Sequence, residues 1–298
     1  MGKDSKTSIM TPTVERSAKV QLPWAQIACI GALVVACYAP VLRALVRQWL
    51  DDPDMGHGFF VPVVAGYILW QRRAELAALK PKPNPWGLLV MLWGAMQLLG
   101  GTLGVELFTS RTALVITLIG VVWTLGGTEI LRKTAFPLFL LFFMVPIPTV
   151  VYNSLTLKLQ LLASRLAAAG LMLVGVPVMR EGNILDLPNG PLSVVEACSG
   201  IRSLLSLTFL SLVYGYFFEK KNWIRAALFA ATIPVAILAN AARVMATGLL
   251  SQIRHDLAEG FFHESTGLVV FFVAALILFV VHKTLIWVSR LVAKRRAA

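Results

Sequence analysis

Residues 195–218 read VEACSGIRSLLSLTFLSLVYGYFF, in which ionisable side chains come first and a long apolar run follows. A membrane span needs about 20 mostly apolar residues, so this stretch predicts a transmembrane helix from residue 199 to 218. Charged groups at the start of a span are costly in lipid unless they are paired or reach water. The layout of the whole chain must therefore explain why Glu196, Cys198 and Arg202 lie here.

The composition is that of a membrane protein that crosses the bilayer several times. The 298 residues are 57% hydrophobic and 14% charged, with a mean hydropathy of +0.75, whereas soluble domains hold about 45–50% apolar and about 25% charged residues. The net charge of +12 indicates basic loops on the inner side of a membrane, and we expect no nucleic-acid partner. Three widely spaced cysteines form neither a disulfide framework nor a zinc site.

Eight apolar segments are predicted to span the membrane, separated by polar breaks such as DDPDMGHG and KPKPNP. They are residues 24–42, 58–71, 86–104, 109–127, 134–149, 199–218, 223–250 and 263–287. A ninth stretch, residues 153–174, is interrupted by polar residues and reads as amphipathic, so we expect it to lie in the interface or re-enter. The following REGNILDLPNGPL has a PNGP turn between short β-prone runs and predicts a small extracytoplasmic hairpin.

The distribution of charge orients this layout. With eight spans and both termini cytoplasmic, 18 of the 27 Lys and Arg residues fall on the inner side, in accord with the positive-inside rule. We therefore expect an all-α polytopic membrane protein of about eight transmembrane helices, in contact with membrane lipid. A polar cytoplasmic tail (1–23), a membrane domain (24–290) and a basic cytoplasmic tail (291–298) divide the chain. An uncleaved N-terminal anchor is favoured over a signal peptide.

This topology brings three reactive side chains to one depth. Cys198 lies at the outer start of the sixth predicted span. Arg243 lies about 30 Å above the inner start of the seventh, at about 1.5 Å per residue, and His263 opens the eighth. A thiolate at a helix N-terminus can attack a carbonyl, an imidazole can carry the proton, and a guanidinium can hold an oxyanion. We assign Cys198 as nucleophile, His263 as acid/base and Arg243 as electrostatic partner, on the outer face of the membrane.

Four neighbouring residues are candidates for support. Arg202 lies one helical turn after Cys198 and can stabilise its thiolate or pair with Glu196. Asn240 precedes Arg243 by three residues and can orient it. His57, in DMGHGFF, also reaches the outer face and either lines the site or ends a loop. The histidines and carboxylates lack metal-ligand spacing, so the sequence implies neither a cofactor nor a metal site.

The chain resembles the exosortase/archaeosortase family, over about residues 40 to 285. The resemblance rests on EACSGIRSL, NAARV and FHESTG, in that order, with MGHGFFVP and MVPIP upstream. It implies a single-domain exosortase, a membrane-embedded thiol protease and transpeptidase linked to protein sorting and exopolysaccharide. The implied substrates are secreted proteins with C-terminal tails of the PEP-CTERM type, which are cleaved and passed to an unidentified acceptor. The family's Cys, Arg and third basic residue correspond to Cys198, Arg243 and His263.

Two other classes of function remain open at this point. In a polytopic transporter, charged residues within spans mark a substrate path. A non-catalytic membrane component of exopolysaccharide export is the other alternative. Cys198 discriminates among them, because only a thiol enzyme depends on its sulfur.

Overall fold

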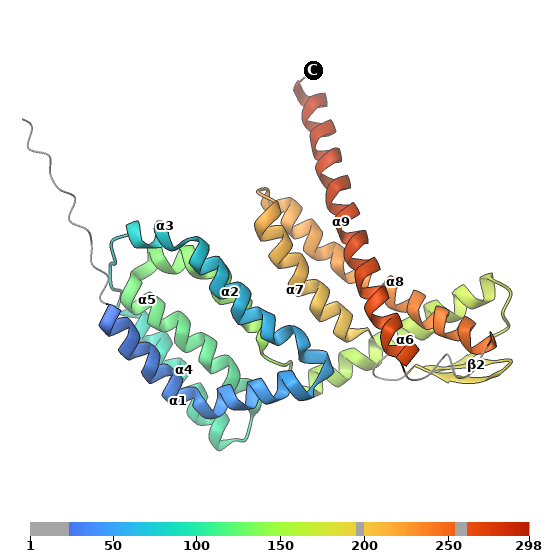
Figure 1. Cartoon of the computed structure of the whole chain (residues 1–298), viewed down its shortest axis with the longest axis horizontal. Helices are drawn as coiled ribbons and strands as arrows, with labels where there is room; N and C mark the ends of the chain where they lie inside the picture. The colour runs from blue at the N-terminus through green and yellow to red at the C-terminus, as the bar shows by residue number, and fades with distance from the viewer. Residues whose placement is uncertain (1–23, 195–199, 254–260, 298) are drawn as a thin grey trace, which may run out of the picture.

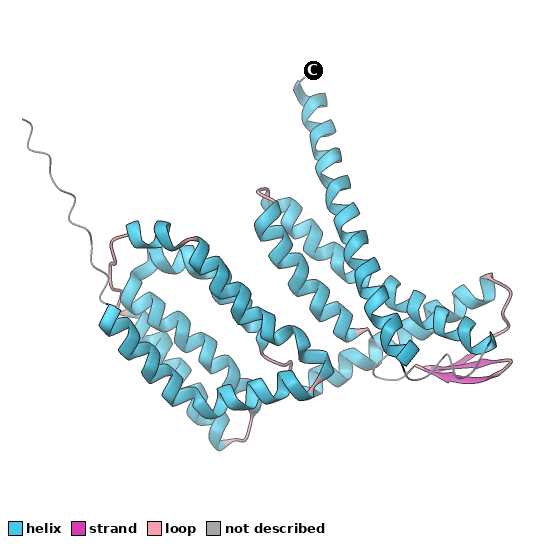
Figure 2. Cartoon of the chain, in the orientation of Figure 1, coloured by secondary structure: helices cyan, strands magenta, loops and turns pink. Residues whose placement is uncertain are grey.

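The computed structural model describes residues 24–194, 200–253 and 261–297, which form helices and one small sheet (Figures 1 and 2). Seven helical segments in these ranges are long and apolar enough to cross a membrane. The predicted fold class, an all-α polytopic membrane protein with a short strand hairpin, is therefore confirmed. Figure 1 shows two groups of helices, and α6 (Thr149–Leu173) leads from the first group into the second.

The first group of helices comes from the N-terminal half of the chain. Its elements are α1 (Trp24–Asp51), the 3-10 helix η1 (Pro53–Phe59), α2 (Phe60–Gln71), α3 (Arg73–Ala78), α4 (Trp86–Leu103), α5 (Leu107–Leu140) and the 3-10 helix η2 (Leu141–Met144). A core that includes Leu45, Ile68 and Val115, all fully buried, joins α1, α2 and α5. Phe209, from the second group, packs into the same core and connects the two groups.

The second group follows. Its elements are α6 (Thr149–Leu173), the strands β1 (Met179–Glu181), β2 (Ile184–Leu187) and β3 (Gly190–Ser193), and the helices α7 (Ile201–Phe218), α8 (Asn222–Ile253) and α9 (Phe261–Ala297). The three strands form an antiparallel sheet in the order β1-β2-β3. Leu187 pairs with Gly190 across the predicted turn, so the hairpin is confirmed and gains a third strand. The sheet packs against the C-terminal half of α6 and against α8.

The layout of the spans differs from the prediction in two places. Residues 109–127 and 134–149 are predicted as separate spans, but the first and residues 134–144 of the second lie within one candidate segment, Leu107–Met144, with no loop between them. The backbone instead breaks at Gly127, whose φ of 80° and ψ of −178° are non-helical. Only glycine fits here, because a Cβ would lie 1.9 Å from the carbonyl oxygen of Lys82. Lys133, beyond the kink, contacts Arg72 at the end of α2.

The short predicted span 58–71 and the amphipathic stretch 153–174 are both helical in the structure. The predicted span 58–71 is represented by α2, whose 12 residues extend about 18 Å. This is shorter than a hydrocarbon core of about 30 Å, and α2 is not among the seven candidates. The stretch 153–174 forms α6, which is among them by length and composition. Whether α6 crosses the membrane or lies in its interface stays a prediction.

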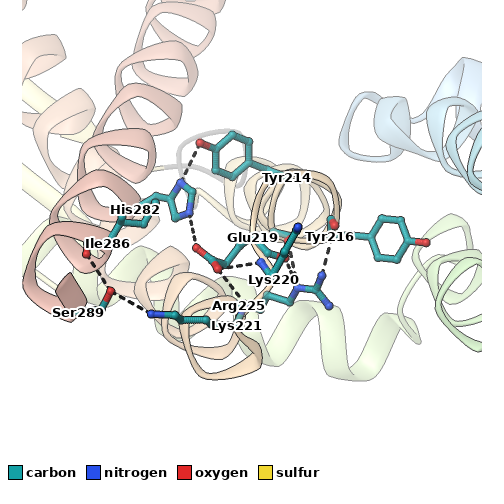
Figure 3. Close-up of polar contacts among 10 residues, drawn as sticks. Tyr214, Tyr216, Glu219, Lys220, Lys221, Arg225, His282, Ile286 and Ser289 are labelled. Atoms are coloured by element: carbon teal, nitrogen blue, oxygen red, sulfur yellow. Dashed lines mark hydrogen bonds and ion pairs between the residues drawn. The ribbon is translucent and has the colours of Figure 1, made fainter. Parts of the chain in front are cut away.

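A buried polar cluster connects α7, the start of α8 and α9 at the end of α7 remote from Gly200 (Figure 3). Nε2 of His282 lies 3.2 Å from a carboxylate oxygen of Glu219, and its Nδ1 lies 2.9 Å from the Tyr214 hydroxyl. The backbone N–H groups of Lys220 and Lys221 donate to the other Glu219 oxygen. The backbone N–H of Lys221 is the largest influence on the pKa of Glu219, and with His282 and the N–H of Lys220 it holds that pKa below its usual range against the opposing effect of burial.

Helices α4 and α5 pack closely through small residues. Gly87, Gly94 and Gly101 recur every seven residues on α4 and are buried against α5. A Cβ on Gly94 would lie 2.3 Å from Oγ1 of Thr117 and 3.2 Å from the carbonyl oxygen of Ala113. Thr117 is itself held by the Tyr38 hydroxyl, 2.7 Å away. Small residues allow helix backbones to approach closely in lipid, where packing and not the hydrophobic effect drives association.

We expect Gly94→Leu to destabilise the protein by about 1–3 kcal/mol, the usual cost of overpacking. The measurement is the midpoint of thermal unfolding in detergent. Gly100→Leu is the matched control on the same helix, because nothing lies within 4 Å of the position of its Cβ. Equal midpoints for the two variants would contradict the close packing of α4 on α5.

Candidate functional site

A cavity of about 590 Å³ opens where η1, the start of α7, α8 and α9 meet. These four elements come from distant parts of the chain, so only the folded protein assembles the cavity. Polar and charged side chains from three of them line it together with apolar residues of α9. Its lining residues are Pro53, Gly56, His57, Gly200, Arg202, Ser203, Ser206, Arg243, Gly267, Leu268 and Phe271.

Arg243 is the buried cation of this cavity, with 9% of its surface exposed. It projects from α8 toward α9, where Gly267 leaves room for it. A Cβ on Gly267 would lie only 3.3 Å from Cζ of the guanidinium. Gly267 follows His263 by one helical turn of α9. Arg243 therefore lies beside α9 at Gly267, while its predicted approach to the His263 side chain stays a prediction.

A second glycine fits the start of α7 against α8. Gly200 is the N-cap of α7 and has a φ of 78°, in the left-handed region that favours glycine. A Cβ on Gly200 would lie 2.6 Å from Cγ of Asn240, which is 4% exposed. Asn240 thus packs against the turn that leads into α7 and, with Gly200, lines a smaller cavity. Cys198 precedes this glycine by two residues.

Arg202, in the first turn of α7, is held by a carboxylate that sequence reasoning did not name. Its Nε donates to Oδ1 of Asp54 in η1, at 2.7 Å. The hydroxyl of Tyr152, in α6, donates to the other oxygen of Asp54. The acidic run DDPDMGHG indicated that this loop carries polar groups. Its pairing with Arg202, 148 residues away, could not be predicted from any local sequence pattern.

His57 lies on the η1 side of the cavity. Burial lowers its pKa, against the opposing influence of the backbone of Phe143 and Asp54 and of the carboxylates of Asp52 and Asp54. A lowered pKa keeps the imidazole neutral near pH 7, a state that can accept a proton. His57 also lines an apolar side chamber of about 210 Å³ formed with Met55, Phe142, Phe143, Val145, Ile147 and Leu205.

Among the predicted site residues, the structure brings together three. Arg243, Arg202 and His57 line one cavity, and Asn240 packs beside it. Cys198 and Glu196 lie outside the described residues. His263 lies in the first turn of α9, and the structure describes only its backbone. Within the described ranges, no three His, Cys, Asp or Glu side chains gather as metal ligands do.

We expect Gly200→Ala to lower the thermal unfolding midpoint more than Gly175→Ala does. Both glycines have positive φ, 78° and 86°, so each alanine meets a backbone cost of about 1–2 kcal/mol. Only Gly200 adds a clash, because nothing lies within 4 Å of a Cβ on Gly175. Equal shifts in detergent would mean that α8 does not support the start of α7.

The comparisons with known proteins give one match. Residues 49–280 match the family described as transmembrane exosortase (Exosortase_EpsH). No curated protein and no solved structure matches the chain. The match covers most of the 298 residues and includes the whole cavity. The chain therefore belongs to the transmembrane exosortase family.

Proposed function

We propose that this exosortase-family protein is a membrane-embedded cysteine protease and transpeptidase. It cleaves C-terminal sorting tails of the PEP-CTERM type on exported proteins and transfers the cleaved proteins to an acceptor. The reaction takes place on the periplasmic face of the inner membrane, with both termini cytoplasmic. The observation that carries the proposal is the cavity, where Arg243 meets the start of α7, two residues after Cys198, and the start of α9, one turn after His263.

The nucleophile of this mechanism is the Cys198 thiolate. A free thiol has a pKa of about 8.5, and a helix N-terminus and nearby cations favour its anion. His263 takes the thiol proton, and the sulfur attacks the carbonyl carbon of the scissile peptide bond. The tetrahedral oxyanion then forms beside Arg243, whose buried guanidinium lines the cavity and can stabilise the negative charge.

The second half of the reaction releases two products in turn. Collapse of the oxyanion breaks the C–N bond, and the imidazolium of His263 gives its proton to the leaving amine of the tail. The exported protein remains bound to sulfur as a thioester. An acceptor nucleophile attacks this thioester, with His263 taking the acceptor's proton, and the thiol is regenerated. Asn240 packs against Gly200 and so helps to fix the position of the start of α7 relative to α8.

The most direct test is co-expression with a secreted reporter that carries such a tail. Wild-type protein should shorten the reporter, and Cys198→Ala should abolish the shortening while the variant still accumulates in the membrane. Mass measurement of the reporter's new terminus gives the cleaved bond and any attached acceptor. Processing that persists in Cys198→Ala would exclude thiol chemistry.

Arg243→Lys tests the electrostatic role. Lysine keeps the charge but loses the planar fork of donors, so a guanidinium that holds the oxyanion should not be replaceable. We expect the rate of reporter cleavage to fall by about 100-fold or more, as for loss of an oxyanion donor. Near-normal cleavage would make Arg243 a general interfacial cation.

A further inference from the structure

We propose that Arg202 binds the substrate and that Asp54 is the positioning residue that directs Arg202 into the cavity. The inference rests on the proposed function, because it names a group that holds the substrate at the same site. The guanidinium of Arg202 donates hydrogen bonds to the substrate segment next to the scissile bond. The acceptors are either main-chain carbonyl oxygens or side-chain carboxylates.

The anchor of Arg202 is fixed from several sides. The Asp54 side chain is 16% exposed and accepts from Arg202 Nε at 2.7 Å. Its second oxygen accepts from the Tyr152 hydroxyl. Its backbone N–H donates to the carboxylate of Asp52 at 2.9 Å. Asp54 thus joins η1, α6 and α7 and restricts the Arg202 side chain, which lines the cavity.

The other end of Arg202 is available to a ligand. Half of its side chain, 50%, is exposed, and it lines the cavity of about 590 Å³. Within the described part of the chain, its one hydrogen bond uses Nε, so the two terminal nitrogens keep their donors. A guanidinium presents these donors in a rigid plane that suits carboxylate and carbonyl oxygens. Ser203 and Ser206 of α7 line the same cavity and add hydroxyl groups.

A purely structural ion pair would behave differently. Pairs with one half-exposed partner add little to stability, because water solvates the charges in the unfolded chain as well. We therefore expect the loss of Asp54 or Arg202 to change substrate binding more than thermal unfolding. The two residues act through one contact, so their effects should not add.

The test measures binding apart from chemistry. Purified Cys198→Ala protein in nanodiscs is titrated with the tail-bearing reporter, with and without a second substitution. Arg202→Ala should weaken binding about tenfold or more, as expected for a lost charge-assisted hydrogen bond. Arg202→Lys should weaken it similarly, because lysine has neither Nε nor the fork. Asp54→Asn should weaken it by about threefold to tenfold, and adding Asp54→Asn to Arg202→Ala should change nothing further.

The matched control is Glu75→Gln. Glu75 forms an ion pair with Arg72 at 2.9 Å outside the cavity, so its loss should leave reporter affinity unchanged. A reporter whose acidic side chains near the cleaved bond are changed to amides separates the two acceptors. Loss of the Arg202 effect with this reporter assigns a carboxylate, and its persistence assigns a main-chain carbonyl.

The outcomes separate the two proposals. Unchanged affinity in Arg202→Ala, or equal losses in Glu75→Gln, would overturn the role of Arg202. Additive effects of Asp54→Asn and Arg202→Ala would overturn the role of Asp54. If Cys198→Ala still cleaves the reporter, the proposed thiol chemistry fails, while the affinities still decide whether Arg202 binds it. If Arg202→Ala accumulates poorly, Arg202→Lys, which keeps the charge, is measured in its place.

Discussion

Two polar side chains on α8 can approach the neighbouring helices only because each faces a glycine. Asn240 packs on Gly200 at the start of α7, and Arg243 packs beside Gly267 near the start of α9. The two α8 residues are three apart and share a face of the helix. A larger side chain at either glycine would separate α7 or α9 from α8. The cavity between these helices depends on this close approach.

The close packing of the helices also buries a charged side chain, that of Arg243. A guanidinium that is 9% exposed, as in Arg243, is costly unless its surroundings compensate for the lost water. His57 and the serines of α7 line the same cavity and make part of its wall polar. Asp54 balances the charge of Arg202 from η1. Two cations thus share one cavity, a setting suited to a thiolate, an oxyanion or a carboxylate.

The sequence predicted most of the helices and the meeting of α8 and α9 because apolar length and charge distribution are local signals. The helical rise of about 1.5 Å per residue was enough to predict that Arg243 lies at the same membrane depth as the start of the eighth predicted span. The PNGP turn predicted the hairpin for a similar local reason. Within the predicted site, Arg243, Arg202 and His57 do line one cavity.

Other features depend on tertiary contacts that no local pattern contains. The break at Gly127 arises where the Lys82 carbonyl meets α5, so the predicted loop between two spans is absent. The pairing of Arg202 with Asp54 needs η1 to fold back onto α7. The seven-residue repeat of glycines on α4 was visible in the sequence, but its meaning requires the threonines and the serine of α5 opposite it.

The proposed mechanism requires the Cys198 sulfur to share the cavity of Arg243. The most direct measurement is crosslinking of Cys198 to a cysteine introduced at Leu268, which lines the cavity and is 61% exposed, in a protein whose Cys29 and Cys37 are replaced by serine. A short bifunctional thiol reagent that reaches only the periplasmic side should join the two positions rapidly. No crosslink, with labelling of Cys198 from the cytoplasmic side alone, would contradict the account.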